Sequence, residues 1–287
     1  SDVYKRQPET LTTSVTALTI SYGGKTTTHA ITVNPKAVNN PTITLSDYSF
    51  EFTGEAITPT VVSVKDGDTV IPAYEYTVEY ADNTNVGTAT VTIVDAAGGN
   101  YTVSGSTTFQ ITKVKATVTK APTANTLTYT GEPQALVTGG EATGGTMQYS
   151  TEENGPYDTA IPTGTNVGSY SVWYKVVGDE NHSGTQPMEV KVTISQASIA
   201  EAEVTLSPES FTYNGQSQTP TVTVKLNGNA LTEGDYTVTY SGDSIDAGTY
   251  TVTVTGKGNY SGTATEKPTY TINPAPLTIS GATLADK

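Results

Sequence analysis

Short runs of alternating apolar and polar residues fill this chain, and one such run occurs three times, at residues 85–93, 166–174 and 246–254. In the first copy the apolar positions are Ala89, Val91 and Ile93, and the positions between them are threonines. A period of two predicts a strand with one buried face and one hydrated face. Threonine suits the hydrated face, because its branched Cβ favours an extended backbone while its hydroxyl stays solvated.

The spacing of these copies predicts a modular chain. Their glycines, Gly87, Gly168 and Gly248, are 81 and 80 residues apart, and each copy precedes a turn with an Asn–aromatic pair: Asn100-Tyr101, Asn181-His182 and Asn259-Tyr260. A period near 80 residues indicates tandem modules, each about the size of a small all-β domain. We interpret the glycine as permitting a tight or positive-φ turn, and the Asn–aromatic pair as a turn end whose ring folds back onto the core edge.

Six segments follow from this period. Residues 1–7 resemble the translation of a sequencing-library adaptor and are excluded from fold reasoning. We expect residues 8–35 to be the C-terminal part of a truncated module, with a Gly23-Gly24 hairpin turn, and residues 274–287 to start a further truncated module. The whole modules are residues 36–113 (module 1), 114–195 (module 2) and 196–273 (module 3). Module 3 repeats module 1 almost element for element, whereas module 2 has a glycine-rich stretch of its own and belongs to a different subtype.

No segment has a helical period, and 27 glycines and 15 prolines supply frequent turns. Strands of four to eight residues between such turns are typical of β-sandwiches. Because the junctions between modules are short, and proline stiffens two of them, we predict an elongated rod. A module of about 35–40 Å, from strands of about eight residues plus end loops, gives roughly 110 Å for three.

Four motifs carry a family resemblance. Residues 211–215, 235–240, 247–254 and 258–262 (FTYNG, DYTVTY, AGTYTVTV and GNYSG) resemble the tandem bacterial immunoglobulin-like repeats (Big/MBG-type) of large cell-surface and adhesin-like proteins. The resemblance implies an all-β fold of tandem immunoglobulin-like β-sandwich modules and a non-catalytic spacer or stalk at the bacterial cell surface. Its partners would be the neighbouring modules of the same chain and, through other domains, the cell wall, a glycan or a host protein. The alternative is a carbohydrate- or host-protein-binding module.

Composition excludes several other classes of function. The chain has no cysteine, hence no disulfide framework and no thiolate metal site. Its formal net charge is −14 and its single arginine, Arg6, lies in the excluded segment, so we expect neither nucleic acid nor anionic lipid as a partner. No apolar run approaches the roughly 20 residues of a membrane-spanning helix, so no membrane insertion is expected.

Candidate chemistry is sparse. His29 and His182 have no nucleophile partner at a recognisable spacing, so no catalytic residue and no enzyme activity are expected. Carboxylates cluster at residues 66–68 and 179–181 and at Asp243 with Asp246, without the spacing of a calcium loop, and we interpret them as solvated turns. We therefore expect no cofactor-binding residue, no metal ligand and no cofactor.

Trp173 is the one candidate contact residue. It aligns with Thr92 and Thr253 on the hydrated face, beside Lys175, where an aromatic ring could stack on a sugar or anchor a partner. The alternative, which we favour, is cross-strand cover by Met147 or Tyr149 on a neighbouring strand.

Overall fold

The computed structural model describes residues 15–278 and 281, so the adaptor-like residues 1–7 lie outside it. The described residues are all-β, as predicted: their one helical element is the 3-10 turn η1 (Ala73–Glu75). Nothing in this part of the chain is a helix long and apolar enough to cross a membrane. The chain forms two compact units, made of Ser1–Val118, Ala142–Thr146 and Val176–Gln186 in unit 1, and of Thr119–Glu141, Met147–Lys175 and Pro187–Lys287 in unit 2.

Unit 1 begins with the predicted hairpin. Strand β1 (Val15–Tyr22) pairs antiparallel with β2 (Lys25–Thr32). The turn residues Gly23 and Gly24 have φ of +54° and +76°, which side chains other than glycine rarely adopt. The Gly-Gly signal therefore identified the turn correctly.

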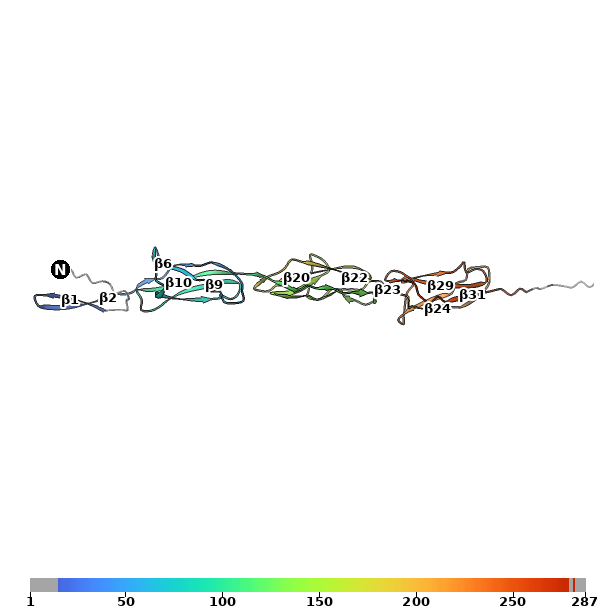
Figure 1. Ribbon diagram of the computed structural model, residues 1–287, viewed down its shortest axis with the longest axis horizontal. Helices are drawn as coiled ribbons and strands as arrows, with labels where there is room; N and C mark the ends of the chain where they lie inside the picture. The colour runs from blue at the N-terminus through green and yellow to red at the C-terminus, as the bar shows by residue number, and fades with distance from the viewer. Residues whose placement is uncertain (1–14, 279–280, 282–287) are drawn as a thin grey trace, which may run out of the picture. The chain divides into compact units, whose positions relative to one another are not determined.

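Module 1 is a β-sandwich within unit 1 (Figure 1). One sheet has the order β3-β10-β9-β8, with β5 pairing parallel to the far end of β10, and the other has the order β4-β6-β7. The bounds are β3 (Lys36–Val38), β4 (Thr42–Leu45), β5 (Ser49–Glu51), β6 (Val61–Asp66), β7 (Thr69–Val70), β8 (Tyr76–Ala81), β9 (Gly87–Asp95) and β10 (Tyr101–Thr112).

The core of module 1 confirms the predicted strand faces. Ala89, Val91 and Ile93 of β9 are at most 1% exposed, whereas the threonines between them face outward. Fully burying a Val or Ile side chain contributes about 1.5–3 kcal/mol, so this alternation holds the two sheets together. Phe109 fills the centre and meets Phe50 edge to face at 5.6 Å between ring centroids.

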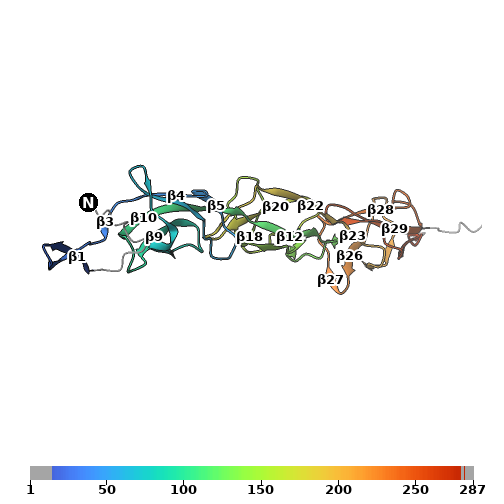
Figure 2. The ribbon, with the colours of Figure 1, turned by 60° about the vertical axis from the view of Figure 1, so that its left-hand side comes forward.

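Module 3 lies in unit 2, and its strand pairings are similar to those of module 1. Its sheets have the orders β25-β31-β29-β28 and β24-β26-β27, and Figure 2 shows β26 and β27 side by side in orange. Tyr270 takes the central position, stacked on Tyr250 at 5.4 Å, and its hydroxyl donates to Ser244 Oγ at 2.6 Å. The bounds are β23 (Ala197–Ser198), β24 (Glu203–Ser207), β25 (Ser210–Thr212), β26 (Thr221–Leu226), β27 (Asn229–Ala230), β28 (Tyr236–Tyr240), β29 (Gly248–Gly256), β30 (Tyr260–Ser261) and β31 (Thr269–Asn273).

Module 2 contributes strands to both units. In unit 2, β20 pairs antiparallel with β22, which pairs parallel with β14; in unit 1, β11 pairs parallel with β21. The bounds are β11 (Val114–Lys115), β12 (Thr117–Lys120), β13 (Thr123–Ala124), β14 (Leu127–Thr128), β15 (Gln134–Ala135), β16 (Val137–Thr138), β17 (Glu141–Thr143), β18 (Gly145–Ser150), β19 (Thr163–Gly164), β20 (Gly168–Gly178), β21 (His182–Ser183) and β22 (Met188–Ser195).

Candidate functional site at the module ends

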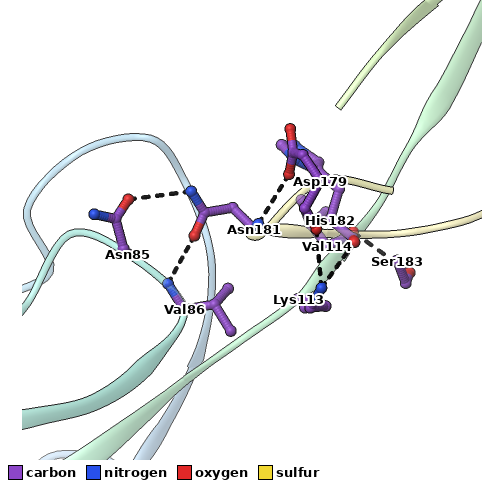
Figure 3. A network of polar contacts seen from close by, with 8 residues as sticks. All are labelled: Asn85, Val86, Lys113, Val114, Asp179, Asn181, His182 and Ser183. Atoms are coloured by element: carbon purple, nitrogen blue, oxygen red, sulfur yellow. Dashed lines mark hydrogen bonds and ion pairs between the residues drawn. The ribbon is translucent and has the colours of Figure 1, made fainter. Parts of the chain in front are cut away.

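Two recurring motifs of the sequence meet inside unit 1. The backbone N–H of Val86, just before β9, donates to Oδ1 of Asn181 at 2.8 Å. The Nδ2 group of Asn181 donates to Oδ1 of Asn85 at 3.1 Å, so the amide side chain is bonded at both ends (Figure 3). Asn181 belongs to the Asn–aromatic pair of module 2, and Asn85-Val86 opens the repeated strand of module 1.

The same arrangement recurs inside unit 2, one module further along the chain. The N–H of Val167 donates to Asn259 Oδ1 at 3.0 Å, and Asn259 Nδ2 donates to Asn166 Oδ1 at 3.2 Å. We call each set an amide clamp: Asn85, Val86 and Asn181 form the first clamp, and Asn166, Val167 and Asn259 form the second. Each clamp gives a half-buried backbone N–H its hydrogen-bond acceptor, which is worth about 0.5–1.5 kcal/mol net.

An aromatic pair accompanies each clamp. His182 meets Phe52 edge to face, with ring centroids 5.4 Å apart, and Tyr260 meets Tyr129 in the same way at 5.3 Å. Edge-to-face pairs contribute about 0.5–1.5 kcal/mol beyond area burial. The N–H groups of Phe52 and Tyr129 donate to the last strand of their own module, at Thr112 O and Ser195 O, which fixes the receiving ring.

The backbone positions the clamp asparagine in the same way in all three modules. The first strand of each module opens with an N–H that donates to the asparagine carbonyl oxygen: Lys36 to Asn100 at 2.9 Å, Val114 to Asn181 at 3.3 Å and Ala197 to Asn259 at 3.1 Å. We call the turn that carries each Asn–aromatic pair the tip of its module. Each tip is therefore hydrogen-bonded to the chain segment that leaves the preceding module.

Module 1 adds a support that the sequence did not reveal. Glu75 is 1% exposed, and its carboxylate accepts the N–H groups of Asn100 and Tyr101, both at 3.2 Å. A Cβ at Gly99 would lie 1.8 Å from Glu75 Oε2, so glycine is required there by the close approach of the carboxylate. Module 3 has Asp235 at the position of Glu75, and its carboxylate bonds Thr232 instead.

The residue at each module junction reaches back to the tip. Lys113 Nζ donates to the carbonyl oxygens of Asp179 at 2.9 Å and His182 at 3.3 Å (Figure 3). Gln196 Nε2 donates to those of Gly258 at 2.9 Å and Tyr260 at 3.1 Å. A charged and a neutral side chain thus each bond two carbonyl oxygens of the tip, and one of the two, that of His182 or Tyr260, is at the equivalent position.

A titratable pair supports the first clamp. His182 Nδ1 lies 2.6 Å from Asp179 Oδ1, and the same oxygen accepts the N–H of Asn181 at 2.8 Å. These contacts lower the pKa of Asp179 below its usual value, chiefly through the hydrogen bond to the His182 side chain. Lys257 occupies the position of Asp179 in the second tip, so the second clamp has no such pair.

Trp173 lies in β20 opposite Glu189 of β22 and belongs to neither clamp. It is half-buried rather than fully exposed, and its role as a partner contact stays a prediction. Lys175, two residues on, places Nζ 4.1 Å from the centroid of the Tyr157 ring.

The acidic turns are engaged by neighbours within their own modules. Asp66 pairs with Lys36 Nζ at 2.5 Å, and Asp243 Oδ1 accepts the hydroxyl of Tyr250 at 3.3 Å. In the described ranges no three His, Asp or Glu side chains converge in a way that could hold a metal ion.

The interpretation of the Asn–aromatic pair as a turn end is confirmed only in part. Tyr101 and Tyr260 do pack against the cores of their own modules. The asparagine contact with the preceding module was missed. The sequence did contain a signal for this contact. Asparagine recurs at this position while the turn residues before it change, and the motif that opens each glycine-led strand recurs with it.

No protein-family model matches the chain, and no curated protein is similar to it. Among solved structures, Drosophila N-cadherin EC1-4 is similar with a TM-score of 0.31 and 11% identity, over 91% of this chain and 82% of that one. Protocadherin Gamma B7 extracellular cadherin domains 1-4 give 0.28 and 12%, over 86% and 80%. Domains 4-9 of surface layer protein SbsC give 0.22 and 15%, over 78% and 43%. No function is transferred from them.

Proposed function

We propose that this chain is a non-catalytic spacer segment of a bacterial cell-surface or secreted adhesin-like protein. The observation that carries the proposal is the amide clamp, which occurs at both module junctions with the same atoms in the same roles. A spacer must transmit position from one module to the next, and a repeated, side-chain-specific junction does this in a way that a flexible linker does not.

The clamps restrict bending in a definite direction. Domain interfaces within one chain usually allow relative motion unless they are extensive. Here each junction combines two amide hydrogen bonds, one ring pair and a side chain bonded to two carbonyls, next to a linker of a few residues. Tilting the tip away from the preceding module would break the hydrogen bond to the half-buried N–H of Val86 or Val167, which costs about 1–3 kcal/mol.

The extracellular bacterial location rests on the resemblance of motifs such as GNYSG (residues 258–262) to bacterial immunoglobulin-like repeats. The absence of cysteine and the net charge of −14 suit a solvated spacer surface. The partners under this proposal are the neighbouring modules, with any cell-wall or host contact made by other domains.

Small-angle scattering tests the spacer proposal. A compact chain of 287 residues has a radius of gyration of about 19 Å, whereas a straight rod of roughly 110 Å has one of about 32 Å. We expect a value near the second, and a value near the first would refute the proposal. The double variant Asn181→Ala, Asn259→Ala should give a broader distance distribution than its matched control, the double variant Asn40→Ala, Asn154→Ala.

The competing class is a binding module. Two surfaces could serve it: the half-buried Trp173, and an open groove of about 500 Å³ beside the Tyr129–Tyr260 pair, lined also by Glu201, Asn227 and Asn229. A glycan array separates the classes, since a spacer gives no signal. A signal that Trp173→Ala removes while Asn227→Ala leaves it unchanged would assign binding to Trp173, and the reverse would assign it to the groove.

A further inference from the structure

Module 3 carries the receiving half of a third clamp. Tyr213 is its counterpart of Phe52 and Tyr129, and its N–H donates to Asn273 O at 2.8 Å, as those of Phe52 and Tyr129 do to the last strands of their modules. Phe52 and Tyr129 are half-buried by the rings of the following tips, whereas Tyr213 is 41% exposed. The backbone of Tyr213 is thus held in the same way as that of Phe52 and Tyr129, but its ring is exposed.

The amide donor of this third copy is also in place. Asp246-Ala247-Gly248 stands where Asn85-Val86-Gly87 and Asn166-Val167-Gly168 stand in the occupied clamps. Ala247 is exposed, and among the described residues its N–H has no acceptor. A carboxylate at residue 246 accepts hydrogen bonds only, and it suits the Nδ2 group of an asparagine because a charged acceptor gives a stronger bond than a neutral one.

The inserting half also has a copy whose side-chain oxygen is unpaired among the described residues. Asn100 of module 1 is the counterpart of Asn181 and Asn259, and its backbone is held identically by the N–H of Lys36. Its Oδ1 atom is buried and has no hydrogen-bond partner within the described part of the chain. In both occupied clamps this is the atom that accepts the backbone N–H of the preceding module. A buried acceptor without a donor is uncommon in folded proteins and needs an explanation.

We propose that Tyr213, Asp246 and Ala247 form a docking surface for the Gly-Asn-aromatic tip of another module of this repeat, and that Gly99-Asn100-Tyr101 has the matching chemistry. The asparagine Oδ1 accepts the N–H of Ala247, its Nδ2 group donates to Asp246, and the aromatic ring meets Tyr213 edge to face. The proposal concerns the contact alone and stands whether or not the chain is a spacer.

The charge at residue 246 makes this surface selective. An asparagine tip supplies both a donor and an acceptor, whereas an aspartate tip would bring a second carboxylate against Asp246 and be repelled. The first and second clamps have neutral Asn85 and Asn166 at that position and lack this repulsion.

A tandem chain tests the proposal. Residues 36–287 of a second copy are joined directly after Pro274, so that Asn273-Pro274-Lys36 reproduces the natural Asn34-Pro35-Lys36 junction. Only the first copy is labelled with ¹⁵N, and hydrogen exchange at Ala247 is compared with that in the single chain, with Val86 and Val167 as internal references. We expect exchange at Ala247 to slow by about tenfold, as for the gain of one hydrogen bond from a positioned side chain.

Variants of the added copy decide which atoms are responsible. Asn100→Ala in that copy should return Ala247 to the single-chain rate. Asn100→Asp should do the same, and Asp246→Asn in the first copy should then restore protection. A sample labelled in the added copy reports its folding through its own Val86. Unchanged exchange at Ala247 beside a folded added copy, protection that persists with Asn100→Ala, or an added copy that fails to fold at this junction would overturn the proposal.

Discussion

The two clamps are built from the same backbone and different side chains. Both use asparagine to bind the N–H of a valine in the preceding module. The first clamp adds His182, held by Asp179 and contacting Phe52, whereas the second adds Tyr260, which contacts Tyr129. Burial raises the pKa of Tyr260, so its phenol stays uncharged over a wide pH range. The amide contact is thus common to both junctions, whereas the aromatic residue determines how each junction responds to pH.

The largest expected effect comes from removing the common element. Asn181→Ala and Asn259→Ala each leave a half-buried N–H without its acceptor. Each variant should therefore lower the free energy of unfolding of module 2 by about 1–2 kcal/mol. Urea denaturation followed by Trp173, the only tryptophan, reports on this module, which takes part in both clamps.

The matched controls are Asn40→Ala and Asn154→Ala, exposed asparagines whose side chains make no hydrogen bond to the described residues. They should change stability by less than about 0.5 kcal/mol. If the clamp variants behave like these controls, the amide contact does not stabilise the junctions.

The next effect distinguishes the two clamps by pH. A lowered carboxyl pKa contributes stability that is complete above the ordinary aspartate value of about 3.9 and is lost as the pH falls through the lowered value. Because the pKa of Asp179 is lowered in this way, acidification should weaken the first clamp. The amide resonance of Val86 should therefore move as the pH falls below the ordinary aspartate value of about 3.9, while that of Val167 should not.

Asp179→Asn supplies the control for this pH response. It keeps a side-chain oxygen that can accept the N–H of Asn181 but removes the titration, so the Val86 resonance should become insensitive to acid. Equal movement at Val86 and Val167 in the parent chain, or movement at Val86 that persists in this variant, would refute the assignment to Asp179.

The smallest effect compares the junction residues. Lys113→Met and Gln196→Met each remove an exposed side chain that donates to two carbonyls. Lys113→Met should lower the free energy of unfolding of module 2, and Gln196→Met that of module 3, by about 0.5 kcal/mol or less. Added salt should reduce the Lys113 effect only, because exposed charges are screened. If either variant lowered the free energy of unfolding as much as the clamp variants do, the junction residue and not the asparagine would make the main contact.

Much of the fold followed from periodicity. The alternation in residues 85–93 predicted the buried face of β9, and the Gly23-Gly24 turn predicted the β1–β2 hairpin. Local backbone rules suffice for such features, because strand faces and tight turns depend on residues close in sequence. The repeat period likewise predicted that the elements of module 1 would recur in module 3, where β25-β31-β29-β28 match β5-β10-β9-β8.

The site required contacts that local rules do not reach. Val86 and Asn181 are 95 residues apart, and a turn asparagine has ordinary local uses that hide a distant one. Glu75 was equally invisible, because a charged residue three positions after a proline suggests a solvated loop. Its burial depends on the fold of residues 99–101 around it.

The most direct test of the account is a scalar coupling across the hydrogen bond itself. With ¹⁵N and ¹³C labels, the Val86 nitrogen should couple to the side-chain carbonyl carbon of Asn181, and the Val167 nitrogen to that of Asn259. Both couplings should be present in the parent chain at neutral pH, and Asn181→Ala should abolish only the first. Their absence at both junctions, with modules 1 to 3 folded, would contradict the claim that asparagine joins one module to the next.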